Sequence, residues 1–164
     1  MQQQYVPNYT GQGWAGKNYK SGQDTKTNTA EIRKIIRKLW PAKEGYRISV
    51  RMESYSGGSS INIDIKAAPF RVFRPEYTAL YKQATETRNW DTIRRLQDEQ
   101  REMPRNDPRR VESIEFTDDA MKLRKDLERL GESFRRNDSD GMIDYFDTNF
   151  YLHVGFHWEM DKDQ

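Results

Sequence analysis

Two histidines are the first side chains in this sequence that could bind a metal ion or exchange a proton. His153 and His157 stand four positions apart in "YLHVGFHW", where apolar and polar residues alternate. This period of two predicts a β-strand, and at ~3.3 Å per residue it places the two side chains ~13 Å apart on one face. One zinc ion cannot bind both at that separation. Because the chain also lacks cysteine, we expect no metal site, no disulfide and no thiol nucleophile.

A glycine pair between serines is the second feature with possible chemistry, since such loops can bind phosphate. It lies in "ESYSGGSSINI", from Glu53 to Ile63. A phosphate cradle needs converging backbone N–H groups, usually at the start of a helix. Here the glycines lead into strand-like sequence, and neither GxGxxG nor GK[ST] is present. A hairpin turn is therefore favoured. The alternative is an anion site, and its candidate ligands are Arg47, Arg51, Ser59 and Ser60.

A helix and a hairpin are the first elements expected to position these residues. The helix in "TNTAEIRKIIRKLWP" would be capped by Asn28, with Glu31 completing a capping box, and would end before Pro41. The segments "YRISVRME" and "INIDIK" alternate apolar and polar residues around the glycines, which predicts an antiparallel hairpin with one buried face. The basic face of the helix is either solvated or a site for an acidic partner: Arg33, Lys34, Arg37 and Lys38.

The C-terminal third predicts a strand, a helix and a second hairpin. "VESIEF" has the pattern of a short strand, and Thr117 can cap the helix that follows. "IDYF" would then pair, through a turn at Asp147, Thr148 and Asn149, with the strand from Phe150 to Trp158. The fold class is α+β, with an antiparallel sheet of two hairpins and a short strand packed against two helices. If the hairpins join edge to edge, their outer face would display Arg47, Ser49, Arg51, Tyr151, His153 and His157.

The remaining segments differ in composition from this domain. Residues 1–26 are rich in Gln, Gly, Asn and Tyr without any period, which predicts a flexible arm. We expect one domain over residues 27–160, a helical insertion at about 75–110, and a tail at 161–164. The insertion is either a solvated helical hairpin, divided near Asn89, or an interaction surface. The residues of that surface would be Trp90, Arg105, Arg109 and Arg110.

Composition limits the classes of function. Of the 164 residues, 34% are hydrophobic and 33% charged, and the net charge is only +2, unlike that of a protein that coats DNA. No apolar run approaches the ~18 residues that span a bilayer, and the N-terminus lacks the apolar region of a signal peptide. We therefore expect no membrane contact and a cytoplasmic location.

Three segments resemble a known family. They are "TKTNTAEIRKIIRKLWP", "SVRMESYSGGSSINI" and "DGMIDYF", spread between Thr25 and Tyr151. Together they resemble one of the numbered large polyvalent protein-associated domains, although Ser139 stands where that family usually has an aromatic residue. The resemblance implies a diverged relative from a phage or conjugative element. It implies no catalytic residues.

Two classes of function follow. The first is a non-catalytic phage or mobile-element accessory protein that binds a host protein, such as an anti-defence inhibitor of the anti-CRISPR kind. The second is a nucleic-acid or nucleotide-binding module that uses the Arg/Tyr/His face of the sheet. For both we expect no catalytic residue, no metal and no cofactor.

Overall fold

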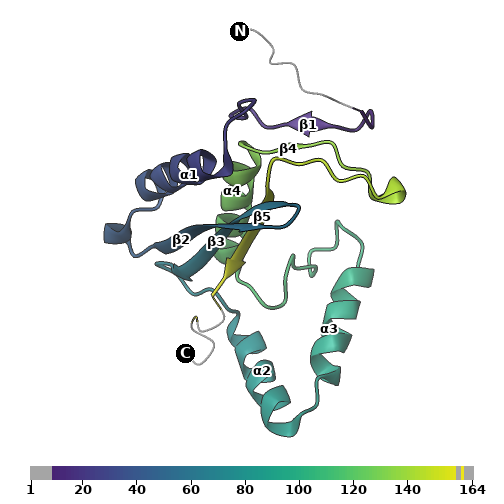
Figure 1. Ribbon diagram of the computed structural model, residues 1–164. Helices are drawn as coiled ribbons and strands as arrows, with labels where there is room; N and C mark the ends of the chain where they lie inside the picture. Colours follow the sequence, from purple (N-terminus) through teal and green to yellow (C-terminus); the bar gives the residue numbers. More distant parts are fainter. Residues whose placement is uncertain (1–8, 158–159, 161–164) are drawn as a thin grey trace. The chain divides into compact units, whose positions relative to one another are not determined.

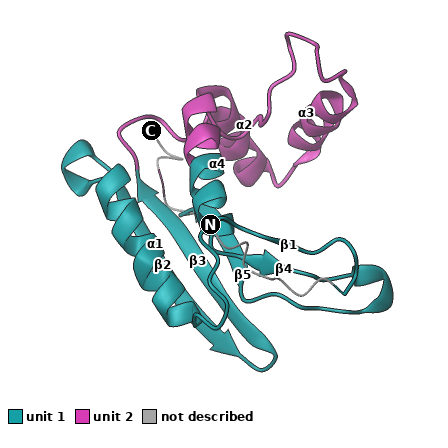
Figure 2. Cartoon of the chain, turned by 90° about the horizontal axis from the view of Figure 1, so that it is seen from above, with its two compact units in different colours: residues 1–67, 124–157 teal, residues 68–123, 158–164 magenta. Residues whose placement is uncertain are grey.

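The computed structural model describes residues 9–157 and Met160 (Figure 1). The chain divides into two compact units, which we describe separately (Figure 2). Unit 1 consists of Met1–Ala67 and Arg124–His157, and unit 2 of Ala68–Leu123 and Trp158–Gln164. Helices and sheets within the described residues confirm the α+β class. Residues 1–8 of the predicted arm and the predicted tail at 161–164 lie outside the described residues.

A three-stranded sheet is the centre of unit 1. Its strands are β2 (Arg47–Tyr55), β3 (Gly58–Ala67) and β5 (Tyr151–Phe156), in the order β2-β3-β5. The antiparallel pairing of β2 with β3 confirms the first predicted hairpin. Strand β5 pairs with β3 in parallel.

The second predicted hairpin is wrong. Ile143, the first residue of the segment expected to pair with the C-terminal strand, instead ends a short 3-10 turn, Gly141–Ile143. The C-terminal strand joins β3, where it extends the apolar face: Ile61, Ile63 and Ile65 stand in register with Leu152, Val154 and Phe156. Alternation identifies the buried face of a strand, but it does not specify the neighbouring strand or its direction. This pairing therefore had to come from the structure.

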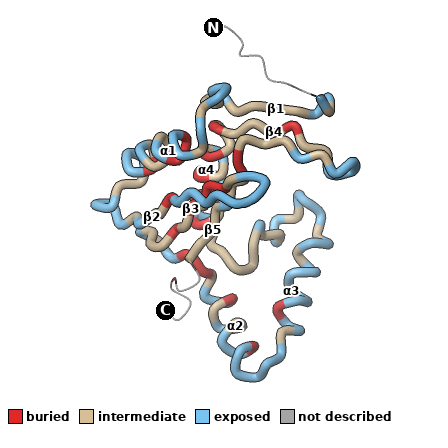
Figure 3. Tube along the Cα trace, in the orientation of Figure 1, coloured by how far each residue is buried: buried red, intermediate tan, exposed pale blue. Residues whose placement is uncertain are grey.

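Two helices of unit 1 lie on the apolar side of the sheet. Helix α1 (Thr25–Leu39) buries Ile32 and Ile36, and contacts β2 and β3. Helix α4 (Asp118–Glu132) crosses from unit 2 into unit 1 and buries Leu127. It comes so close to β5 that a Cβ added at Gly131 would lie 2.6 Å from the side chain of Leu152. Burial is accordingly concentrated along α1, β3 and α4 (Figure 3).

The start of α1 differs from the prediction. Asp24 caps the helix by accepting a hydrogen bond from the Thr27 backbone N–H at 2.6 Å. Asn28 lies inside the helix and is buried, and its side chain accepts a hydrogen bond from Gln23 at 2.6 Å. Asp and Asn are both favourable N-cap residues. The helix begins about one turn earlier than predicted, so Asp24 is the cap and Asn28 is buried within the helix.

Part of the predicted flexible arm instead lies against the C-terminal half of unit 1. Strand β1 (Trp14–Ala15) pairs antiparallel with β4 (Arg136–Asn137), beside it in Figure 1. The backbone N–H of Gly16 donates to the Arg135 carbonyl at 2.8 Å, and that of Asn18 to the Ser133 carbonyl at 2.7 Å. Composition predicted an arm because few apolar residues are present. Backbone hydrogen bonds to a strand edge do not depend on them.

Unit 2 includes the segment at about 75–110 that was expected to be a helical insertion. Helices α2 (Pro75–Thr87) and α3 (Asp91–Glu102) flank the predicted break near Asn89. The predicted strand "VESIEF" is wrong, because only one bridge forms there, between Phe73 and Phe116. Hydrogen bonds from Arg74 hold this segment in place of strand pairing. Its guanidinium donates to the Ser113 and Phe116 carbonyls at 2.9 and 2.8 Å.

None of the helices within residues 9–157 combines the length and the apolar composition that crossing a bilayer requires.

The glycine turn supplies a first test of the fold. Gly57 has a φ of 94°, whereas Gly58 has no positive φ and room for ordinary contacts around an added Cβ. We expect Gly57→Val to lower the free energy of unfolding by about 1–3 kcal/mol, because a β-branched side chain resists positive φ. Gly58→Ala is the matched control and should change it little. Chemical denaturation of both variants measures the difference, and equal losses would contradict this assignment.

Candidate binding sites

One face of the sheet in unit 1 is polar, and we call it the polar sheet face. Arg51, Asn62 and His153 form one row across the three strands. The next row contains Glu53, Ser60 and Tyr151. The structure thus brings Arg51, Tyr151 and His153 to one face, through the parallel pairing of β5 rather than through joined hairpins.

The proposed anion ligands do not converge there. Ser59 points to the opposite side of the sheet, where its hydroxyl is 2.7 Å from that of Thr25 in α1. Ser60 is buried. The Arg51 guanidinium is 2.7 Å from the Asp64 carboxylate, and Arg47 lies near the far end of the hairpin from the glycines. The anion hypothesis therefore loses its serine hydroxyls.

Two tyrosine rings approach Gly58 at the glycine turn. A Cβ at Gly58 would lie 3.6 Å from Cε2 of Tyr151 and 3.7 Å from Cε2 of Tyr55. Tyr55 is 48% exposed. An exposed aromatic ring such as that of Tyr55 can stack on a planar group such as a nucleobase.

The binding residues predicted in unit 2 are not close together. Trp90 lies at the start of α3, and its ring packs against Tyr81 with centroids 5.5 Å apart. The predicted arginines follow the other end of this 12-residue helix, ~18 Å away along its axis. Arg109 is held by Asp107 through a salt bridge of 2.8 Å. Trp90 and the predicted arginines are therefore about one helix length apart.

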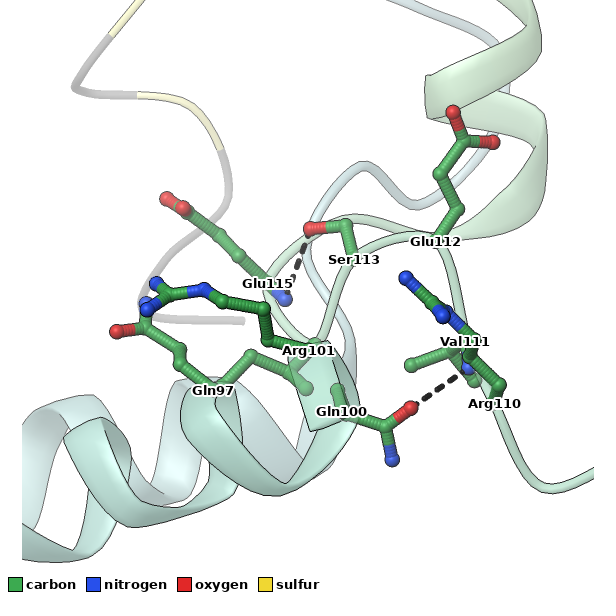
Figure 4. Close-up of a pocket in the computed structure, with 9 residues that line it drawn as sticks. Gln97, Gln100, Arg101, Arg110, Val111, Glu112, Ser113 and Glu115 are labelled. Carbon is green, nitrogen blue, oxygen red and sulfur yellow. Dashed lines mark hydrogen bonds between the residues drawn. The ribbon is translucent and has the colours of Figure 1, made fainter. Parts of the chain in front are cut away.

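A cavity of about 390 Å³ in unit 2 includes one of these arginines, Arg110 (Figure 4). Side chains of α3 face residues 110–115 across it. The Gln100 side chain accepts a hydrogen bond from the Val111 backbone N–H at 2.8 Å, and Arg110 donates to the Met103 carbonyl. These contacts connect the loop to the helix, so we assign them a structural role.

The sequence prediction missed a projecting hairpin at residues 138–147, which we call the tip. Backbone hydrogen bonds join Asp138 to Asp147 at 2.8 Å, and Asp140 to Tyr145 at 2.7 and 2.9 Å. Asp140 also accepts from the Met142 backbone N–H at 2.9 Å, which closes the turn. In Figure 1 the tip is the yellow-green loop beyond β4.

Three large apolar side chains of the tip are in solvent. Met142 is 96% exposed, Ile143 69% and Phe146 66%. The sequence analysis placed Ile143 and Phe146 in a strand, although the turn residues in "SDGMID" offered a contrary signal. Grouped apolar residues exposed on a short loop commonly mark a contact with another macromolecule.

The base of the tip is fixed by buried polar contacts. The Asp138 carboxylate accepts hydrogen bonds from the Thr10 hydroxyl at 2.6 Å and the Tyr9 backbone N–H at 2.5 Å. The Thr10 hydroxyl is the main cause that lowers the pKa of Asp138. Arg136 forms a salt bridge with Asp147, and this hydrogen bond raises the pKa of the guanidinium. The backbone that carries the apolar side chains of the tip is therefore held at its base before any partner binds.

Within the described residues, no three carboxylate or histidine side chains are grouped in a way that could hold a metal ion. Comparisons with protein-family models, with curated proteins and with solved structures found no significant match.

Proposed function

We propose that this chain is a non-catalytic accessory protein of a phage or mobile element, and that it binds a host protein through the tip. The mobile-element origin comes from the resemblance described for the sequence. A component of a host defence system is the partner class that this origin favours. The exposed apolar side chains of the tip support the choice of contact.

One observation carries the proposal: Met142, Ile143 and Phe146 are exposed on a hairpin whose base is fixed. Binding hot spots are apolar or aromatic side chains that become buried in a pocket of the partner. A preorganised loop loses little conformational entropy on binding, which favours affinity. Acidic residues around the apolar group, Asp140 and Asp144, would add charge selectivity.

Affinity capture from host extract tests this function. The immobilised wild-type chain should retain one host protein at a stoichiometric level. Replacing Met142 and Ile143 together by Gln removes apolar area without changing charge. We expect this variant to bind the identified, purified partner at least about 30-fold more weakly, the effect of losing a hot spot of ~2 kcal/mol.

Asn62→Ala is the matched control, because it alters the polar sheet face and leaves the tip intact. It should retain the partner as the wild type does. Equal retention by the tip variant, or no specific retention by the wild type, would refute the proposed function.

A second candidate is binding of single-stranded nucleic acid on the polar sheet face. The observation that favours it is that Arg51 and His153 share one row of the sheet, while the rings of Tyr55 and Tyr151 both approach Gly58. The salt bridge from Arg51 to Asp64 and the net charge of +2 reduce its electrostatic attraction.

Fluorescence anisotropy with labelled single strands at about 50 mM salt tests this candidate, because phosphate contacts are still strong there. Tyr151→Ala should weaken binding by ~1–3 kcal/mol through lost stacking. Arg51→Gln should reduce the log–log salt slope by about 0.7. Absence of wild-type binding at this salt concentration would exclude the candidate.

A further inference from the structure

An apolar groove lies between α1 and α4 in unit 1, and we call it the α1–α4 groove. It encloses about 740 Å³, a volume within the range of ligand and peptide sites. Its apolar lining comes from both helices, and Leu39 in it is 55% exposed. The lining residues are Lys17, Asn18, Ile35, Leu39, Trp40, Asp126, Arg129, Leu130 and Ser133.

The surroundings of this groove are mainly basic. Lys17 and Arg129 line it together with one acidic residue, Asp126, whose carboxylate is 3.4 Å from Arg129. The charge of Lys17 is not balanced by another residue of the lining. The last turn of α1, which supplies Leu39, also carries Arg37 and Lys38. An occupant of this groove should therefore combine apolar side chains with negative charge.

The tip of the same chain has that chemistry. Its residues 138–147 include four aspartates and no lysine or arginine. Its exposed apolar side chains, Met142 and Ile143, lie between Asp140 and Asp144. The tip and the groove are thus complementary both in polarity and in charge.

The tip cannot fill the groove of its own chain. In Figures 1 and 2 the tip and α1 lie at opposite ends of unit 1. The tip is also held at its base by Asp138 and by the bridge between Asn137 and Thr148. Only a tip from another molecule can reach the groove.

We propose that the tip of one copy of this chain inserts into the α1–α4 groove of a second copy. The contact is head-to-tail, because it joins two different surfaces and leaves one tip and one groove free in each pair. It covers apolar side chains that are otherwise in water. A hairpin loop in a groove forms a small interface, so the association is weak and depends on concentration.

Sedimentation velocity on the purified chain, from about 10 µM to 1 mM, measures this association. The wild type should shift from monomer towards larger species as concentration rises. Met142→Gln with Ile143→Gln should abolish the shift by removing the tip contact. Leu39→Gln should abolish it by altering the groove, at a position exposed enough to leave the fold intact.

Mixing the two variants gives the most specific result. The groove of the tip variant is intact, and so is the tip of the Leu39 variant. An equimolar mixture should therefore form a 1:1 dimer that grows no further, although each variant alone is monomeric. Asn62→Ala, on the polar sheet face, should associate as the wild type does.

Three outcomes would overturn the proposal: a wild type that stays monomeric at every concentration, a Leu39 variant that associates normally, or a mixture that forms no dimer. The inference shares the tip with the proposed function, but the two can fail separately. Leu39→Gln removes self-association and leaves the tip free to bind a host protein. Self-association without any retained host protein would refute the proposed function alone.

Discussion

Ile63→Ala is expected to lower the free energy of unfolding by about 2–5 kcal/mol, among the largest effects for a single residue in unit 1. Ile63 is completely buried at the centre of β3, between Val50 of β2 and Val154 of β5. Truncation to alanine removes transfer free energy and leaves a cavity that two flanking strands prevent from collapsing. A thermal melt should show a midpoint lower by roughly 5–20 °C.

Two variants of the same strand control this measurement. Ile63→Val keeps most of the volume and should cost about 0.5–1.5 kcal/mol. Asn62→Ala changes the adjacent residue on the polar sheet face, where substitutions usually stay within about ±0.5 kcal/mol. A loss at Asn62 as large as that at Ile63 would contradict the assigned faces of the sheet.

Gly16→Ala is expected to detach the N-terminal segment from α4, at a cost of about 3 kcal/mol. A Cβ at this position would lie 2.3 Å from the Glu132 carbonyl oxygen and 2.4 Å from the backbone of Ser133. Overpacking usually costs 1–3 kcal/mol, and here the obstructing atoms are backbone that cannot rotate away. Limited proteolysis should then cut the chain between Gly16 and Asp24 faster than in the wild type. Denaturation should show a second cooperative transition, from the separate release of the N-terminal segment.

Gly155→Ala is the matched control for this prediction. An added Cβ at Gly155 meets no atom within 4 Å, and its φ is not positive. Alanine in the interior of a strand should therefore be neutral or slightly stabilising. If Gly16→Ala behaves in the same way as Gly155→Ala, the close approach of the N-terminal segment to α4 is wrong.

Local patterns predicted the parts of this fold that depend on neighbouring residues. Alternation identified β2 and β3, glycine identified their turn, and Asn89 marked the division of the insertion into α2 and α3. Each of these features is determined within a few residues of chain. The sequence also identified the side of β5 that carries His153, because a strand presents alternate residues to opposite faces.

Contacts between distant segments could not be predicted in this way. The pairing of β5 with β3 and of β1 with β4 depends on edges that no local pattern describes. The tip was missed for a related reason. Met142 and Ile143 are apolar, and apolar residues are expected to be buried unless a contact with another molecule accounts for them. Alternation therefore predicted which residues share the polar sheet face, but no local pattern predicted how the tip residues are grouped.

The parallel pairing of β5 with β3 also affects how the protein is made. Val154, which pairs with Ile63, comes about 90 residues later in the chain. Most of unit 2 lies between them in the sequence. During synthesis β2 and β3 emerge first, and the apolar edge of β3 stays open until β5 leaves the ribosome. Closing so long a loop is slow, and an unpaired apolar edge is prone to aggregate in the meantime. An early fold of unit 2 would shorten the effective loop and limit that exposure. The inserted unit would then assist the folding of unit 1, whatever else it binds.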